Sequence, residues 1–206
     1  MAVMGLVAAI GIGYLLGAIP WGVIVGRLIG VDPRGSGSGR TGTTNTLRTL
    51  GTAAAVIVLV LDMAKGAGAV LIGHAIGASL DDPHAWAGSM AGVAAVIGHV
   101  RSIFIGFTGG RGAAPGAGAV LAIAPLALLA ATPVFWLIAP LTGLVSLGTL
   151  LANLTMVLAA AALYLTGHLG VEGMVAAALI GLVIFVAHAD NIGRLRAGTE
   201  RRFGRG

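Results

Sequence analysis

The chain has 206 residues, of which 57% are hydrophobic and only 9% are charged, with a net charge of +5 and a mean hydropathy of +1.01. Because a soluble domain carries about 25% charged residues, this composition excludes an ordinary soluble protein. The absence of cysteine excludes disulfides, thiolate catalysis and cysteine-bound metals, and the basic residues have no interleaved aromatics, which disfavours nucleic acid as a partner.

Apolar stretches follow one another along most of the chain. A membrane-spanning helix needs about 20 apolar residues. Three candidates of that length are Ala2–Ile29, Thr52–Ala78 and Trp86–Ile105, and a longer apolar region runs from Gly116 to Ala189. The pattern predicts an all-α polytopic membrane protein in which residues 1–206 form one integral-membrane domain.

The charged residues between these stretches predict the orientation of the chain. Basic residues gather in three segments, 34–48, 101–111 and 194–205, whereas Asp81, Asp82 and Glu172 lie in other connections. The positive-inside rule places the three basic segments in the cytoplasm. The N-terminus is then expected outside and the C-terminus inside.

The region from Gly116 to Ala189 must cross the membrane an even number of times to keep its basic flanks on one side. Four short helices satisfy this condition, with expected breaks near Thr132–Pro133, Gly148 and Gly167–Gly170. Helices shorter than usual are tolerated where the bilayer thins. About seven spans are therefore predicted.

The first polar segment, "GSGRTGTTNTLR", runs from Gly37 to Arg48. It fits G-x-G-x-x-G and most of the P-loop pattern, but both nucleotide folds need a preceding strand, and here a membrane span precedes it. Its glycines still allow backbone N–H groups to face an anion, and a helix beginning near Thr43 would direct its positive end there. The segment predicts a phosphate site; a flexible polar loop is the alternative.

Two more polar segments lie on the same predicted side. "GHVRSIFIGFTGGRG" contains His99, and "HADNIGRLRAGTERR" begins with His188, followed by Asn191 at a spacing that places both on one helical face. Three segments rich in Gly, Arg, His and Asn on one face of the membrane predict a composite anion site there.

Asp62 and Lys65 are an acid–base pair inside the second span. Charges there are costly unless they are paired, and a spacing of three allows the two side chains to meet. Two interpretations remain open: a neutralised pair that joins helices, or a Lys65 that faces the anion site.

These segments resemble the motifs of the bacterial membrane glycerol-3-phosphate acyltransferases that use acyl phosphate, the PlsY family. Its first motif, roughly G-S-G-N-x-G-A-T-N-x-x-R, is similar to Gly37–Arg48, and its second, roughly G-H-x-x-P-x-F-x-x-F-K-G-G-K-G, to Gly98–Gly112. Its third, roughly H-x-x-N-I-x-R-L-x-x-G-x-E, is similar to His188–Glu200, and its D-x-x-K-G to Asp62–Gly66. The matches extend over nearly the whole chain in the family's order.

The chain departs from the family pattern at several positions. Arg40 replaces the Asn of the first motif, while Ser102, Thr108 and Arg111 replace the Pro and the two Lys of the second. One cation is thus lost from the second motif and one is gained in the first. Which cation meets which phosphate is left open.

The resemblance implies a transfer of an acyl group from acyl phosphate to the 1-hydroxyl of glycerol 3-phosphate, which gives lysophosphatidic acid and phosphate in the first acylation step of phospholipid synthesis. It implies seven spans in the cell (inner) membrane, an active site that faces the cytoplasm, and no cofactor or metal. The expected partners are both substrates, membrane lipid and the enzyme that supplies acyl phosphate. The main alternative is a transporter of phosphate or an organic phosphate, although the inverted repeats common in transporters are not found.

The resemblance also implies the site. The expected catalytic residues are Ser38, Arg48, His188 and Asn191. The expected substrate-binding residues are Gly37, Gly39, Arg40, Gly42, Thr43, Thr44, Asn45, Lys65, His99, Thr108, Gly109, Gly110, Arg111, Gly112, Arg194 and Glu200.

Two roles within this set need specific chemistry. The base that takes the hydroxyl proton is either His188, oriented through Asn191, or the substrate's own phosphate. Backbone N–H groups around Ser38–Gly39, helped by Arg48, are expected to stabilise the oxyanion. No His or Asp adjoins Ser38 in the sequence, so Ser38 is expected to form hydrogen bonds and not to act as a nucleophile.

Overall fold

The computed structural model describes residues 2–79 and 85–202, and the predicted outer-loop residues Asp81 and Asp82 lie outside them. Within the described ranges the regular elements are all helices, with one isolated bridge between Ser102 and Thr108. The chain divides into two compact units, an N-terminal unit (Met1–Ile123) and a C-terminal unit (Ala124–Gly206). The predicted all-α class is confirmed.

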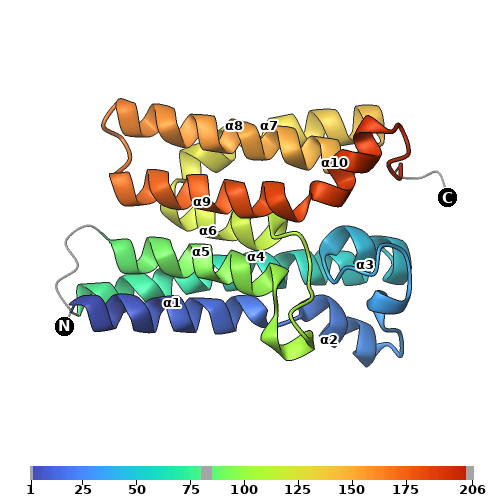
Figure 1. Ribbon diagram of the computed structural model, residues 1–206, viewed down its shortest axis with the longest axis horizontal. Coiled ribbons are helices and arrows are strands. Elements are labelled where there is room, and N and C mark those ends of the chain that lie inside the picture. The colour runs from blue at the N-terminus through green and yellow to red at the C-terminus, as the bar shows by residue number, and fades with distance from the viewer. Residues whose placement is uncertain (1, 80–84, 203–206) are drawn as a thin grey trace. The chain divides into compact units, whose positions relative to one another are not determined.

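The N-terminal unit is a helical bundle in which α1 packs on α4 and α5, and α4 packs on α5 and α6 (Figure 1). Small residues allow this close approach: a Cβ on Gly66 or Gly118 would collide with the backbone of Pro115 or Met63. Its elements are α1 (Ala2–Ala18), α2 (Trp21–Leu28), η1 (Pro33–Gly35), α3 (Thr43–Leu50), α4 (Thr52–Ala78), α5 (Trp86–Val100), η2 (Ile103–Ile105) and α6 (Ala113–Ile123).

The C-terminal unit consists of α7 (Pro125–Thr142), α8 (Val145–Leu165), α9 (Val171–Ala187) and α10 (Ala189–Arg196). Helix α8 packs on both α7 and α9. Asn153 of α8 donates a hydrogen bond from Nδ2 to the carbonyl of Gly181 in α9, at 3.0 Å. Helices α9 and α10 meet at an angle of 58°, so the polar segment that begins at His188 turns away from the apolar helix before it.

After Arg111, four apolar helices separated by three breaks were expected. The structure contains four, α6 to α9, but two of the three expected breaks are wrong. Pro133 lies inside α7, which is tolerated in membrane helices because neighbouring groups satisfy the freed backbone. The helix begins instead at Pro125, where a missing N–H costs nothing.

Gly148 is also not a break. It lies inside α8, and a Cβ there would come within 2.9 Å of Ala139 Cβ on α7, so this glycine permits close packing of two helices. The turn falls at Gly143, whose φ of +71° suits glycine. The third break, near Gly167–Gly170, is confirmed, because α8 ends at Leu165 and α9 begins at Val171.

The third predicted span is shorter than expected, whereas the second matches α4 and the first corresponds to the apolar stretch Val3–Leu28. Ala2–Ile29 is divided between α1 and α2 by Pro20, which cannot donate an N–H within a helix. Trp86–Ile105 ends as a helix at Val100. The Ser102 hydroxyl then donates to the Ala18 carbonyl at 2.5 Å, and its N–H donates to Thr108, which turns the chain back.

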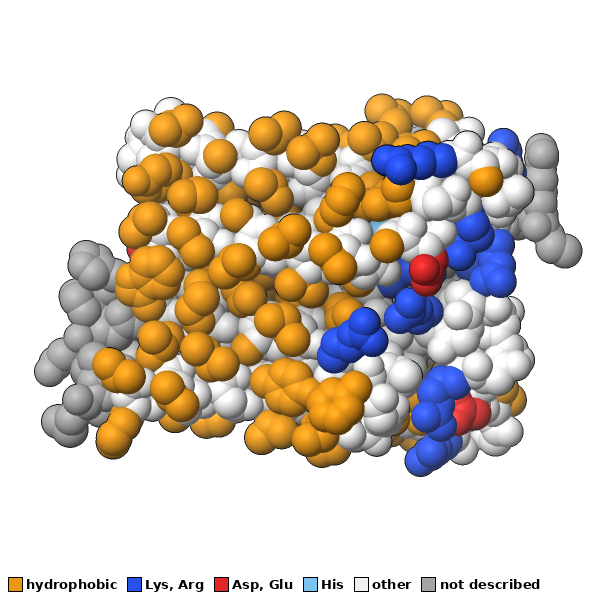
Figure 2. All heavy atoms as spheres, in the orientation of Figure 1, with side chains coloured by type: hydrophobic (Ala, Val, Ile, Leu, Met, Phe, Trp, Pro, Cys, Tyr) orange, Lys and Arg blue, Asp and Glu red, His pale blue; other side chains and the backbone are white. Residues whose placement is uncertain are grey.

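Four helical stretches of the described chain are long and apolar enough to cross a membrane, or five if the bent pair α9–α10 counts as one. Two shorter apolar helices, α5 and α6, accompany them. Many exposed side chains on the face drawn in Figure 2 are hydrophobic, as lipid contact requires. Seven crossings and the orientation of the termini remain predictions.

Candidate functional site

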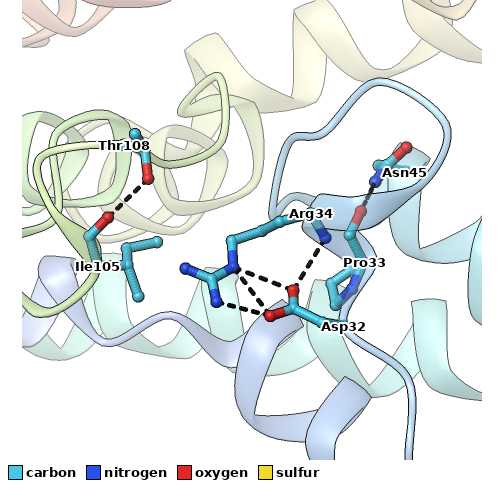
Figure 3. Close-up of polar contacts among 6 residues, drawn as sticks. All are labelled: Asp32, Pro33, Arg34, Asn45, Ile105 and Thr108. Atoms are coloured by element: carbon cyan, nitrogen blue, oxygen red, sulfur yellow. Dashed lines mark hydrogen bonds and ion pairs between the residues drawn. The ribbon is translucent and has the colours of Figure 1, made fainter.

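The first polar segment is organised around the buried side chain of Asn45, on α3. Its Nδ2 donates to the carbonyl of Pro33 at 2.8 Å (Figure 3). The same Nδ2 contacts the carbonyls of Arg40 at 2.9 Å and Ser36 at 3.3 Å, and Oδ1 accepts the N–H of Ser38 at 2.7 Å. One amide therefore holds the loop from both sides. Asn45 thus shapes the backbone that precedes α3; its expected contact with substrate stays a prediction.

This arrangement bears on the predicted oxyanion donors. The N–H of Ser38 is donated to Asn45, and the N–H of Gly39 is donated to the Ser36 carbonyl at 3.1 Å. Both expected donors are thus already used within the loop. Helix α3 does begin at Thr43, as predicted, and the first N–H groups of a helix have no partner in the preceding turn.

Arg34 belongs to the same basic segment, but its charge is balanced locally. It forms a forked contact with Asp32, with 2.6 Å between Nη2 and Oδ2 (Figure 3). Hydrogen bonds from Arg34 lower the pKa of Asp32 from 3.8 to about 2. This pair caps η1 and keeps Arg34 occupied with a partner at physiological pH.

Lys65 joins α4, α5 and the break between α1 and α2 in the N-terminal unit. Its Nζ lies 2.8 Å from Asp62 Oδ1, 2.8 Å from the Ile19 carbonyl and 2.9 Å from His99 Nδ1, and all three charged or titratable side chains are buried. Pro20 breaks the first span and leaves the Ile19 carbonyl available to Lys65. The structure shows the ion pair within α4, with His99 of α5 as a third member; a Lys65 that faces the anion site stays a prediction.

The contact with Lys65 determines which nitrogen of His99 carries the proton. Asp62 Oδ1 lies 3.5 Å from Nδ1 of His99, but the Lys65 ammonium is nearer, at 2.9 Å, and only donates. Nδ1 is therefore assigned as the acceptor, and a neutral ring then carries its hydrogen on Nε2. That Nε2 lies where a Cβ of Gly110 would be, and 3.9 Å from where a Cβ of Gly42 would be. His99 therefore presents a donor between the first and second glycine-rich segments.

Two glycines of the second segment, Gly109 and Gly110, are required by the position of His99. A Cβ on Gly109 would collide with the His99 carbonyl, and a Cβ on Gly110 with the imidazole ring. The Gly110 N–H also donates to the His99 carbonyl at 3.1 Å. Thr108, which stands where the family has a Lys, is exposed and donates its hydroxyl to Ile105 at 2.7 Å (Figure 3).

In the C-terminal unit, Glu200 accepts hydrogen bonds from two polar side chains of the third segment and from Ser146. Its Oε1 accepts from Asn191 Nδ2 at 2.7 Å and from Ser146 Oγ at 3.0 Å, and its Oε2 accepts from Arg194 Nε at 2.7 Å. Burial by itself raises the pKa of Glu200, but the hydrogen bonds from Asn191, Arg194 and Ser146 outweigh it, and the net pKa is lowered. Glu200 is thus an ionised carboxylate that holds Asn191, Ser146 and Arg194 together, an arrangement called the Glu200 clamp below. It was expected to bind substrate, but its contacts are with protein donors.

His188, at the junction of α9 and α10, is buried, and its Nδ1 lies 2.8 Å from the Ile184 carbonyl. A carbonyl only accepts, so Nδ1 carries the hydrogen and the lone pair of the neutral ring is on Nε2. The orienting partner is thus Ile184, whereas Asn191, predicted for this role, donates to Glu200.

The structure brings the first two segments and Lys65 together in one unit, and the third segment together in the other. Sequence reasoning missed Asp62 as a site residue and Ser146 altogether. Asp62 could have been included from its spacing to Lys65. Ser146 carries no local signal, because its partner Glu200 is 54 residues away in the chain.

The family model of glycerol-3-phosphate acyltransferase matches residues 7–198, a range that includes parts of both units. The chain belongs to this family. Curated glycerol-3-phosphate acyltransferases support it: that of Synechococcus sp. (strain JA-3-3Ab) is 46% identical over 204 residues, covering 97% of this chain and 93% of the relative. That of Trichlorobacter lovleyi is 40% identical over 190 residues, covering 92% and 93%.

A solved structure extends the likeness to the fold. The crystal structure of PlsY (YgiH), an integral membrane glycerol 3-phosphate acyltransferase, in its glycerol 3-phosphate form has a TM-score of 0.84 and 35% identity, with 98% of this chain and 96% of that chain covered. A lysophosphatidic acid form of PlsY has the same TM-score and identity. The resemblance to PlsY-type acyltransferases of phospholipid synthesis is confirmed, and the transporter interpretation is set aside.

Proposed function

We propose that this acyltransferase takes its acyl group from acyl phosphate and places it on the 1-hydroxyl of glycerol 3-phosphate. The hydroxyl oxygen attacks the acyl carbonyl, the bond between acyl carbon and phosphate oxygen breaks, and lysophosphatidic acid and phosphate result. The glycerol 3-phosphate and lysophosphatidic acid forms of the PlsY neighbour support the acceptor and the product. Because the mixed anhydride is already activated, the reaction needs no added cofactor.

The observation that carries the proposal is the meeting of two glycine-rich segments around the Nε2–H of His99. Donors that converge on a turn with little side-chain bulk suit a phosphate oxygen. Arg40, Arg48 and Arg111, on or beside these segments, supply positive charge. Gly37, Gly39, Gly42, Thr44, Thr108, Gly109, Gly110 and Gly112 complete the proposed binding surface.

The oxyanion of the tetrahedral intermediate needs preorganised donors. We assign this role to the first N–H groups of α3, at Thr43 and Thr44, in place of the Ser38 and Gly39 groups that the loop itself uses. Arg48 adds positive charge from the last turn of the same helix. The Ser38 hydroxyl remains a proposed hydrogen-bonding group.

The proton of the 1-hydroxyl goes to a base. His188 is proposed for this role, because the hydrogen bond from Nδ1 to Ile184 leaves its lone pair on Nε2. Arg194 and Glu200 are proposed as positioning residues, since Glu200 accepts hydrogen bonds from both Asn191 and Arg194. The substrate's own phosphate is the alternative base.

The donor assignment is tested with purified protein and glycerol 3-phosphate by following lysophosphatidate and phosphate release. Acyl phosphate should support turnover, whereas acyl-CoA and acyl carrier protein should be poor donors, because the glycine-rich loop follows a helix and not the strand of a nucleotide-binding fold. Equal rates with acyl-CoA would contradict the assignment of acyl phosphate as the donor, but not the assignment of the chain to its family.

The proposed site faces the cytoplasm of the cell (inner) membrane, in a protein of seven spans with its N-terminus outside. The chain contains no native cysteine, so single cysteines can report sidedness. Gly35→Cys and Gly193→Cys add side chains where nothing lies within 4 Å. Both should react with an impermeant thiol reagent only from the cytoplasmic side; labelling of position 193 from outside would require an odd number of crossings after Arg111.

A further inference from the structure

The turn between α5 and α6 carries its large apolar side chains on the outside. It runs from Arg101 to Thr108, includes η2, and is called the η2 turn below. Ile103 is 49% exposed, Phe104 58% and Phe107 56%, whereas a turn that faces water is usually built from small and polar residues. A group of exposed apolar side chains marks a contact with lipid or with another protein.

One of these residues is kept exposed in an unfavourable backbone conformation. Phe107 has a φ of +56°, in the left-handed region that glycine adopts readily and residues with a Cβ rarely do. A glycine at this position would relieve the backbone but would remove the ring. Strain that a fold retains points to a function of the strained residue, so the exposed ring is the feature to explain.

The polar groups of the η2 turn find their partners within the turn. The Ser102 carbonyl accepts the N–H of Phe107 at 2.7 Å and that of Ile105 at 3.3 Å, and the Ser102 N–H donates to the Thr108 carbonyl at 3.0 Å. The Thr108 hydroxyl donates to the Ile105 carbonyl at 2.7 Å (Figure 3). Backbone groups near hydrocarbon need partners inside the protein, because lipid tails offer none. The turn therefore suits surroundings that supply few hydrogen bonds.

The base of the η2 turn lies beside a candidate membrane span. The Ser102 hydroxyl donates to the Ala18 carbonyl at 2.5 Å, and the Tyr14 hydroxyl donates to the Arg101 carbonyl at 2.7 Å. Both partners belong to α1, and the apolar stretch Val3–Leu28 continues beyond Ala18. The turn is thus attached to a segment that is apolar enough to lie in the membrane.

The exposed area of the η2 turn is too small for a stable protein partner. Three side chains of this size, each about half exposed, offer roughly 300 Å² of apolar surface, whereas a specific protein interface takes about 800 Å² from each partner. Arg101 is exposed beside them, and a cation at the membrane surface is attracted by anionic lipid headgroups. Lipid is the occupant that fits both observations.

We propose that the η2 turn is a lipid anchor, in which Ile103, Phe104 and Phe107 insert at the boundary between lipid headgroups and acyl chains. The anchor fixes the depth of Gly109 and Gly110, which follow it directly in the chain. This inference goes beyond the proposed function and does not depend on the acyl donor or on the base.

The test uses Phe104→Cys in the full-length chain, which has no native cysteine. The thiol is labelled with bimane, and the protein is placed in vesicles of phosphatidylcholine and phosphatidylglycerol. We expect a blue-shifted emission, loss of fluorescence with lipids that carry a nitroxide near the headgroup, and protection from aqueous iodide. Ile103→Cys and Phe107→Cys should give the same result, and they keep the proposal testable if Phe104→Cys does not fold.

Two control positions bracket the expected depth. Gly35→Cys, where nothing lies within 4 Å of the added side chain, should be quenched by iodide and not by nitroxide lipids. Leu71→Cys, at a position inside α4 that is 62% exposed, should be quenched best by a nitroxide at the end of the acyl chain.

Three results at position 104 would overturn the proposal. Quenching like that of position 35 would mean that the η2 turn lies in water. Quenching like that of position 71 would mean that it lies deep in the hydrocarbon. Protection from iodide and from both nitroxide lipids would mean that a protein, such as a second copy of this chain, covers the turn.

Discussion

His99 in the N-terminal unit and His188 in the C-terminal unit are both buried, yet their neighbours select opposite tautomers. Lys65 donates to Nδ1 of His99, so that ring presents Nε2–H as a donor. Ile184 accepts from Nδ1 of His188, so that ring presents a lone pair on Nε2. In the proposed mechanism the same side chain therefore binds an anion in one unit and accepts a proton in the other.

The supporting contacts differ in the same way. In the N-terminal unit, Asn45 binds backbone groups and shapes a loop. In the C-terminal unit, Glu200 binds the side chains of Ser146, Asn191 and Arg194. In the proposed mechanism the contacts of Asn45 with the backbone shape the binding surface, whereas the contacts of Glu200 with side chains orient groups near the proposed base.

The largest expected effect separates the two histidines. His188→Ala should lower kcat about 10²- to 10⁴-fold, because a proton-accepting group is lost. His99→Ala and Arg111→Ala should chiefly raise KM for one phosphorylated substrate, because those contacts exist in the ground and transition states alike. Steady-state kinetics with both substrates varied provides the measurement. A near-normal kcat in His188→Ala would make the substrate's phosphate the better candidate for base.

Lys65→Met should remove the donor that fixes the tautomer of His99. The variant leaves Asp62 buried without its ion-pair partner, which costs about 3–5 kcal/mol of stability. Thermal unfolding in detergent should show a large drop in Tm. The double variant Asp62→Leu/Lys65→Met removes both charges and should recover most of the Tm, since a buried pair as a whole contributes little net stability. Failure of the double variant to recover stability would contradict this account.

Gly110→Ala should disturb the donor that His99 presents. The added methyl group collides with the imidazole ring, and overpacking of this kind costs about 1–3 kcal/mol. We expect a lower Tm together with a raised KM for a phosphorylated substrate. Gly35→Ala, where nothing lies within 4 Å, is the matched control and should change neither quantity. Normal KM in Gly110→Ala would show that the ring is free to move.

The smallest effect concerns the clamp around Glu200. Because its folded pKa is lowered, Glu200 contributes stability above its unfolded value of 4.5, and this contribution is lost as the pH falls through the folded value. The Tm difference between wild type and Glu200→Gln should therefore shrink as the pH is lowered from 6 toward 3. A difference that is constant over this range would mean that the carboxylate is not the ionised centre of the clamp.

The sequence by itself determined the class, one helix and the family. Composition indicated a helical membrane protein, continuous apolarity located α4 at Thr52–Ala78, and glycines followed by a polar run located the beginning of α3 at Thr43. Three ordered motifs led to the acyltransferase family. These features depend on neighbouring residues, so they can be read from a single sequence.

Only the tertiary structure decided which proline or glycine breaks a helix and which nitrogen of a histidine carries a proton. Pro133 and Gly148 remain helical because packing and nearby groups compensate for them, whereas Pro20 and Gly143 end their helices. The tautomer of His99 depends on Lys65, 34 residues away, and the orientation of Asn191 depends on Glu200 in the chain beyond α10. Hydrogen-bond partners of this kind are set by the fold, because a donor and its acceptor must meet in space whatever their separation in the chain.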